Sequence, residues 1–283
     1  MEDDGLYLPQ IGRHSLEKIR RHNVYAAIFA RAMRPSWKHV VYIGLYSGAG
    51  RAVVKGTGEL VETSAMGVLK QQPPFTKYIF VDSDPRCIHA LRERIGALPE
   101  SFDVTLINRP VNDSVSEIIE SMPSFDLGRR EGLLTLCFID PFRFDLDFGV
   151  LRALSRFRID FLIMLPLGFD LRRNFRRYLR DEEDTRVAAF LDAPNWREEW
   201  RARNRSDRAF VRFAFERFDQ AMIRLGFRRQ EMRDTVSVKV TGMGVHLYSL
   251  ALYTRHELGE RFWRTTITAA DSVLQLDLDG VGD

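Results

Sequence analysis

Three short stretches of the chain combine residue types that can do chemistry. The first is Asp140-Pro141-Phe142, which directly follows the apolar run Leu133 to Ile139. A carboxylate at the end of a buried strand can accept a hydrogen bond and orient a reacting group, and an aromatic ring beside it can serve as a platform for a planar substrate. We therefore take Asp140, Pro141 and Phe142 as the candidate catalytic residues, with a plain turn at the strand end as the alternative.

The second stretch is the turn Tyr46-Ser47-Gly48-Ala49-Gly50, which follows the apolar run Val40 to Leu45. Glycine tolerates positive φ angles and lets a ligand come close to the backbone. A strand that runs into such a turn is typical of open α/β sheets, which bind nucleotide-like ligands at the carboxyl ends of their strands. An ordinary turn has the same pattern, so the interpretation depends on the stretches that follow.

The third stretch begins where the apolar run Tyr78 to Val81 ends at Asp82. A carboxylate in this place can accept hydrogen bonds from ribose hydroxyls. Asp84 competes for that role, although it could also cap the helix that Pro85 begins. The polar residues Asn112 and Asp113 come after the next apolar run, 104–107. The expected cofactor-binding residues are Tyr46, Ser47, Gly48, Gly50, Asp82, Asp84, Asn112 and Asp113.

Alternating apolar runs and helical patterns position these stretches. Strands are expected at 40–45, 78–81, 104–107, 133–139 and 161–165, which predicts a doubly wound α/β sheet that is mostly parallel. Residues 236–240 and 247–253 predict an antiparallel hairpin at its end. We expect a helix at 14–33 and a loop or short hairpin at 51–63. The expected organisation is one domain over 1–264, a helical insertion at 170–233 within it, and a C-terminal tail at 265–283.

Arginine dominates the basic residues, because only six of the 42 are lysine. Residues 172–233 contain 17 arginines against 11 acidic residues, with tryptophan and phenylalanine interleaved. A packed helical insertion with a solvated charged face explains most of this pattern. A basic surface with aromatic residues also suits nucleic acid.

The composition sets the class of protein. The chain has 283 residues, of which 45% are hydrophobic and 29% charged, and its net charge is +3. It has no apolar run near the roughly 20 residues that a membrane-spanning helix needs, and its acidic beginning differs from a signal peptide. We expect a cytoplasmic protein without membrane contact. Cys87 and Cys137 fall in predicted buried elements, and no cluster of cysteine and histidine suggests a metal site.

Several stretches together resemble the three-Cys-motif partner (TcmP) family, bacterial proteins with a class I methyltransferase-like fold. The resemblance covers most of residues 14–264 and rests on the order and spacing of its motifs. The matching stretches are His14 to Lys18 with Tyr25, Tyr42 to Arg51, Phe138 to Phe142, Asp160 to Pro166, and His246 to Tyr253 with His256, Gly259 and Trp263.

The resemblance implies a Rossmann-like methyltransferase sheet and S-adenosyl-L-methionine (SAM) as cofactor. Its first functional expectation is methyl transfer to a nitrogen of a nucleic acid, with Lys18, Arg51 and Phe142 near the substrate. A small molecule or a protein is the other substrate class. The alternative function is a weak or inactive partner subunit of a three-Cys-motif protein. Gly44 stands where the family has an acid, which favours the alternative, whereas the glycine turn, Asp82 and Asp-Pro-Phe favour the enzyme.

Overall fold

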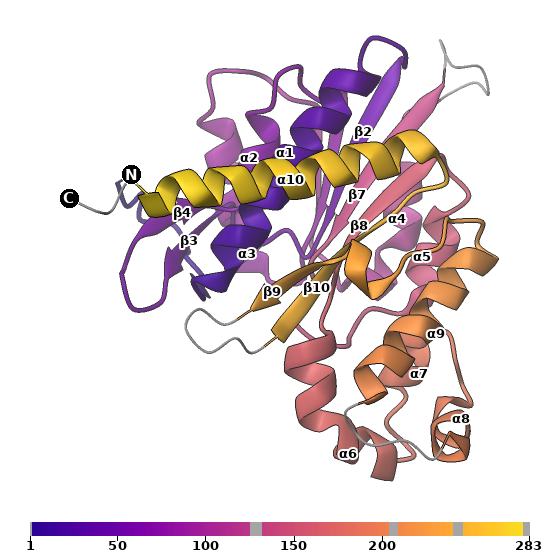
Figure 1. Cartoon of the computed structure of the whole chain (residues 1–283). Helices are drawn as coiled ribbons and strands as arrows, with labels where there is room; N and C mark the ends of the chain where they lie inside the picture. Colours follow the sequence, from indigo (N-terminus) through magenta and orange to yellow (C-terminus); the bar gives the residue numbers. More distant parts are fainter. Residues whose placement is uncertain (1, 125–131, 204–208, 240–245, 280–283) are drawn as a thin grey trace.

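The structure is a computed structural model that describes residues 2–124, 132–203, 209–239 and 246–279. Its centre is a seven-stranded sheet with the strand order β6-β5-β2-β7-β8-β10-β9 (Figure 1). Five neighbouring strands are parallel, β10 is antiparallel to β8, and β9 is antiparallel to β10. The strands are β2 (His39–Leu45), β5 (Lys77–Val81), β6 (Val104–Ile107), β7 (Leu133–Ile139), β8 (Ile159–Leu165), β9 (Val236–Lys239) and β10 (His246–Tyr253).

The predicted fold class, a doubly wound Rossmann-like sheet with a C-terminal antiparallel hairpin and a helical insertion, is confirmed. The central strands are buried on both faces, as continuous apolar runs predict. The chain passes from β2 toward β5 and β6 on one side, and from β7 toward β8 on the other. The crevice between β2 and β7 is therefore the switch point at which such sheets bind ligands.

Helices cover both faces of the sheet. One face carries α1 (His14–Met33), α2 (Ser64–Leu69), α3 (Pro85–Gly96) and α10 (Glu257–Asp279). Tyr25 of α1 and Trp263 of α10 share a hydrophobic cluster there with Tyr42 of β2, and α10 packs across α1 (Figure 1). The other face carries α4 (Val115–Glu120) and α5 (Phe148–Leu154) together with helices of the insertion. Because α10 continues to Asp279, the segment expected as a tail is helical over residues 265–279.

A second, three-stranded sheet lies beside the main one and consists of β1 (Gln10–Ile11), β3 (Arg51–Val54) and β4 (Leu60–Glu62). β3 and β4 form an antiparallel hairpin, as expected for 51–63, and β1 pairs with β3 in parallel. This pairing fixes the segment before α1 next to the hairpin. The start of α1 and the hairpin therefore lie on the same side of the glycine turn.

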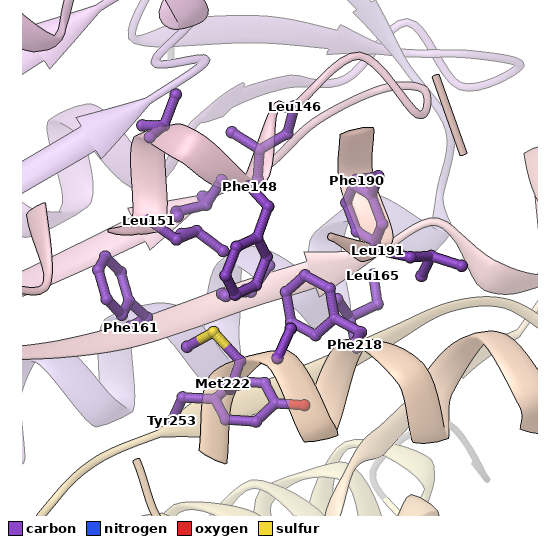
Figure 2. Packing of buried hydrophobic residues seen from close by; sticks show 14 of the residues in the cluster. Leu146, Phe148, Leu151, Phe161, Leu165, Phe190, Leu191, Phe218, Met222 and Tyr253 are labelled. Carbon is purple, nitrogen blue, oxygen red and sulfur yellow. The ribbon is translucent and has the colours of Figure 1, made fainter. Parts of the chain in front are cut away.

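The insertion leaves the sheet at the carboxyl end of β8 through the π-helical turn Leu167–Leu171. Its helices are α6 (Arg172–Arg180), α7 (Arg186–Leu191), α8 (Trp196–Ala202) and α9 (Phe210–Arg224). Figure 2 shows Phe218 and Met222 of α9 packing with Phe148 of α5, Phe161 of β8 and Tyr253 of β10. The insertion thus shares one core with the sheet.

Cys87 and Cys137 are both buried and form no disulfide with each other, as expected for cysteines in the core. Burial is also the first cause that raises the pKa of each thiol. In the described part of the chain we find no helix long and apolar enough to cross a membrane.

Candidate functional site

A cavity of about 760 Å³ opens at the carboxyl ends of β2, β5 and β7. Its walls come from the start of α1, the glycine turn after β2, the hairpin, and the segments that follow β5 and β7. The polar lining residues include His14, Ser15, Lys18, Tyr46, Ser47, Lys55, Thr63, Asp82, Asp140 and Asp145. This is the position in which a doubly wound sheet holds its ligand.

The turn after β2 has three residues with positive φ: Tyr46 at 61°, Gly48 at 67° and Gly50 at 84°. A Cβ on Gly48 would meet no atom within 4 Å, so this glycine leaves open space at the cavity wall. A Cβ on Gly50 would lie 2.9 Å from both Leu91 Cδ1 and Met66 Cγ. Gly48 therefore allows close approach to the backbone, whereas Gly50 allows α2 and α3 to pack beneath the turn.

Asp82 holds this turn in place. Its Oδ2 accepts a hydrogen bond from the Gly48 amide at 2.8 Å, and its Oδ1 accepts one from the Asp84 amide at 2.9 Å. Burial raises the pKa of Asp82, and the two backbone donors oppose that effect. The carboxylate lines the cavity while it is fixed by the backbone. It is therefore a pre-oriented acceptor.

Asp84, Asn112 and Asp113 do not belong to the set of residues that line this cavity. Asp84 caps α3 by accepting from the Arg86 amide at 2.9 Å, and the Arg86 guanidinium beside it lowers the pKa of the carboxyl. Asn112 donates to the Asp145 carbonyl at 2.8 Å and accepts from the Asp147 amide at 2.9 Å. Asp84 thus caps a helix, as its alternative reading had it, and Asn112 joins two loops.

Asp140 is paired with Lys18, whose Nζ lies 2.6 Å from Asp140 Oδ2. Both side chains are mostly buried, with 17% of Lys18 and 23% of Asp140 exposed. Pro141 and Phe142 follow along the same wall, and the Phe142 ring is 64% exposed at the mouth. The Arg143 guanidinium carbon lies 5.9 Å from the centre of that ring. The structure therefore brings Lys18, a predicted substrate residue, together with the predicted catalytic motif.

Arg51, the third predicted substrate residue, lies outside the lining of the cavity. Its Nη1 pairs with Asp4 Oδ2 at 3.0 Å, and Arg94 Nε contacts the same carboxylate at 2.8 Å. The hydrogen bond from Arg94 holds the pKa of Asp4 well below its usual range. Arg51 thus helps to fix the N-terminal segment, which a spacing argument does not reveal.

The wall is completed by three residues that the sequence did not single out for the site, His14, Tyr248 and Asp145, and by the predicted residue Tyr46. The His14 ring stacks on Tyr248 of β10, with centroids 6.1 Å apart and planes at 26°. Burial lowers the pKa of His14, and the positive charge of Lys18 adds to the effect. The i, i+4 spacing of His14 and Lys18 on α1 was the available signal. Burial, followed by the charge of Asp145, raises the pKa of the Tyr46 hydroxyl, which hydrogen-bonds to that carboxylate.

Gly44 also lines the cavity, two residues before Tyr46. A Cβ at this position would lie 3.0 Å from Phe80 Cδ1 and 3.2 Å from Tyr42 Cε1. Aromatic carbon therefore occupies the space into which an acidic side chain would project.

Among the residues that the structure describes, we find no group of three or more histidine, cysteine, aspartate or glutamate side chains that could hold a metal ion.

Comparison with known proteins gives likeness of structure only. No protein-family model matches the chain, and no curated protein matches it, so the resemblance to the TcmP family stays a prediction. Similar solved structures include TYW2 from P. horikoshii in complex with MeSAdo, at 10% identity over 90% of this chain and 70% of that one (TM-score 0.43).

Two further similar structures are a putative O-methyltransferase from Klebsiella pneumoniae and a putative methyltransferase in complex with the Haloferax volcanii Trm112 methyltransferase activator. The first has 14% identity over 86% of this chain and 89% of that one, with a TM-score of 0.42. The second has 12% identity over 86% and 93%, with a TM-score of 0.39. Identities and TM-scores this low carry no information about substrate or reaction.

Proposed function

We propose that the cavity binds SAM and that the protein is a SAM-dependent methyltransferase. The observation that carries the proposal is the glycine turn at the switch point of the sheet, held by a carboxylate that also lines the cavity. In this proposal Asp82 accepts hydrogen bonds from the ribose hydroxyls, and the chain that joins ribose to the amino-acid end passes the open space at Gly48. When bound, SAM supplies an electrophilic methyl group.

The charges along the cavity also favour SAM. Three carboxylates, Asp82, Asp140 and Asp145, line it together with two ammonium groups, Lys18 and Lys55. SAM carries a net positive charge, because its sulfonium and ammonium outnumber its single carboxylate. A cavity with an excess of carboxylates attracts such a ligand.

For the acceptor, we propose a nitrogen that hydrogen-bonds to Asp140. Lys18 holds Asp140 through the ion pair, and Phe142 presents an exposed ring beside it. In-line displacement at a methyl group depends mainly on holding the nucleophile in place, so an oriented acceptor and a stacking platform provide what the reaction needs. A planar nitrogen heterocycle fits this arrangement.

The finer proposal is that the heterocycle belongs to a nucleic acid that contacts α6. Many arginines of the insertion are engaged within the protein: Arg203 pairs with Glu216, Arg224 with Asp192, and Arg197 donates to three backbone carbonyls. α6 differs in composition, because it contains five arginines and no acidic residue. Arg176, Arg177 and Arg180 are exposed there, and Arg177 pairs with Asp184 outside the helix. Because α6 follows the carboxyl end of β8, it begins at the edge of the sheet that carries the cavity.

Transfer of a labelled methyl group from SAM to a pool of RNA or DNA tests this function. We expect labelling of nucleic acid by the wild-type protein and its loss in Asp140→Ala, with SAM affinity retained. Methyl transfer that persists in Asp140→Ala at unchanged cofactor affinity would show that Asp140 has no catalytic role. Labelling of protein or small molecules instead would move the substrate to another class.

The second candidate, a catalytically weak partner of a three-Cys-motif protein, is favoured by one observation. Gly44 and the aromatic rings around it replace the acid of the resembling family. This candidate predicts binding to such a protein and no measurable SAM binding by the chain alone.

A further inference from the structure

Two hydroxyl groups beside the glycine turn are buried and have no hydrogen-bond partner among the described residues. They are Ser47 Oγ and Thr63 Oγ1. Both residues line the cavity, and both side chains are partly exposed although the oxygens themselves are covered. Buried polar atoms are nearly always hydrogen-bonded, so an unsatisfied hydroxyl at a cavity wall calls for an explanation.

The backbones of these two residues are fixed, whereas their side chains are not used by the fold. The Ser47 amide donates to the Val81 carbonyl at 3.0 Å, and the Thr63 amide donates to the Gly50 carbonyl at 2.8 Å. Thr63 occupies the N-cap position of α2 with extended backbone, yet its side chain makes no capping hydrogen bond. Threonine at an N-cap normally accepts from the first turn of its helix. The Thr63 hydroxyl is therefore available for another purpose.

At Gly44 the situation is the reverse, because this position offers a ligand no polar side chain. In the register of the sheet, Gly44 lies between Phe80 of β5 and Phe138 of β7, and all three residues line the cavity. Aromatic carbon from Phe80 and Tyr42 fills the place of a side chain at Gly44. A ligand with a zwitterionic amino-acid end finds no carboxylate at this position. Its polar groups need partners elsewhere around the turn.

We propose that the hydroxyls of Ser47 and Thr63 bind the α-amino-acid end of SAM, a role that rests on the proposed function of the cavity. A hydroxyl donates one hydrogen bond and accepts others, so this pair suits both the carboxylate and the ammonium of the ligand. Rotation about the Cα–Cβ bond turns each oxygen toward the cavity without any change of backbone. The two residues flank the turn that Gly48 leaves open, which places them on either side of the same path.

The experiment compares two ligands that differ only at this end. S-adenosylhomocysteine carries the amino-acid group, and in 5′-methylthioadenosine a methyl group on sulfur replaces the whole chain that ends in it. Thr63→Val exchanges the hydroxyl for a methyl group of nearly the same shape. Calorimetry measures the affinity of each variant for both ligands. We expect Thr63→Val to bind S-adenosylhomocysteine about tenfold or more weakly than wild type, as for loss of a hydrogen bond to a charged group, and to bind methylthioadenosine with unchanged affinity. Ser47→Ala should act in the same direction.

The matched control is Thr135→Val. Thr135 lies within β7, away from the cavity lining, and its Oγ1 is likewise buried without a partner among the described residues. It should change the affinity of neither ligand. All three variants should melt no lower than wild type, because none removes a hydrogen bond that the structure contains.

The outcomes separate this inference from the proposed function. If wild type binds both ligands and the ratio of their affinities is the same in Thr63→Val and Ser47→Ala, the inference is overturned and the cavity keeps its assignment. A lower melting temperature with an unchanged ratio would assign the hydroxyls a structural role and overturn it equally. If wild type binds neither ligand, the proposed function fails and the inference fails with it.

Discussion

The carboxylate of Asp160 gives a quantitative test of how the fold is held together. It lies in β8, within hydrogen-bond distance (3.4 Å) of the Tyr25 hydroxyl of α1, and it also interacts with the Thr254 side chain and with the positive charge of Arg255. Burial raises the pKa of Asp160 to about 6, against an ordinary value of 3.8. The folded protein therefore holds this proton more tightly than the unfolded chain does.

The sign of the effect follows from that difference. Below pH 3.8 Asp160 is protonated in both states, and its full contribution to stability is present. As pH rises from about 4 to about 6, the unfolded chain loses the proton first, so the free energy of unfolding falls. A difference of roughly two between the folded and unfolded pKa values of Asp160 corresponds to about 3 kcal/mol of stability, of which about 2 kcal/mol is lost between pH 4.5 and 7.

His22 acts in the opposite direction over nearly the same range. It is fully buried on α1, its Nε2 lies 2.8 Å from the Tyr42 hydroxyl, and burial lowers the pKa of His22 to about 4. The unfolded chain binds the proton more tightly here, so stability rises with pH between about 4 and 6.5. The two groups nearly cancel in the wild type. Asp160→Asn removes the contribution of Asp160, so the pH dependence caused by His22 is no longer offset.

Urea unfolding at pH 4.5 and pH 7 measures the effect. Relative to wild type, Asp160→Asn should gain about 2 kcal/mol between the two pH values. Asp103→Asn, which alters a carboxylate that is 61% exposed, is the control and should follow the wild-type curve more closely. Parallel curves for Asp160→Asn and wild type would refute the reasoning.

Two further predictions concern the turn and the insertion. Gly50→Ala should destabilise the fold by about 2–4 kcal/mol in urea unfolding, because positive φ adds to the clash with Leu91 and Met66, and Gly48→Ala should cost only about 1–2 kcal/mol. Equal losses would contradict the separate roles of the two glycines. The double variant Arg176→Gln/Arg180→Gln should reduce the salt slope of nucleic-acid binding by about two phosphate contacts in a filter or anisotropy assay. The double variant Arg203→Gln/Arg224→Gln, which changes two arginines outside α6, should reduce that slope less. A larger reduction of the slope in Arg203→Gln/Arg224→Gln than in Arg176→Gln/Arg180→Gln would show that nucleic acid binds outside α6.

The sequence predicts the sheet well because its strands are long apolar runs that end at polar turns. The predicted bounds of α1 and β7 are those of the structure, and the hairpin at 51–63 and the C-terminal hairpin are confirmed. These elements depend on local periodicity and on turn residues, which are properties of neighbouring positions. Residues 240–245, between β9 and β10, lie outside the described residues.

The site is predicted less completely because its contacts join distant parts of the chain. The ion pair between Lys18 and Asp140 spans 122 positions, and the stacking of His14 on Tyr248 joins the first helix to the last strand. Arg51 directly follows the glycine turn in sequence, yet its guanidinium pairs with Asp4, in the N-terminal segment whose strand β1 pairs with β3. Local spacing contains no signal for such pairings.

The most direct test of the central claim is a calorimetric titration of the purified protein with SAM and with S-adenosylhomocysteine. The account predicts micromolar binding that falls by about tenfold or more in Asp82→Ala and is retained in Asp84→Ala, because only the first carboxylate both lines the cavity and holds the turn. Absence of binding at millimolar SAM, or equal loss in the two variants, would contradict the assignment of this cavity.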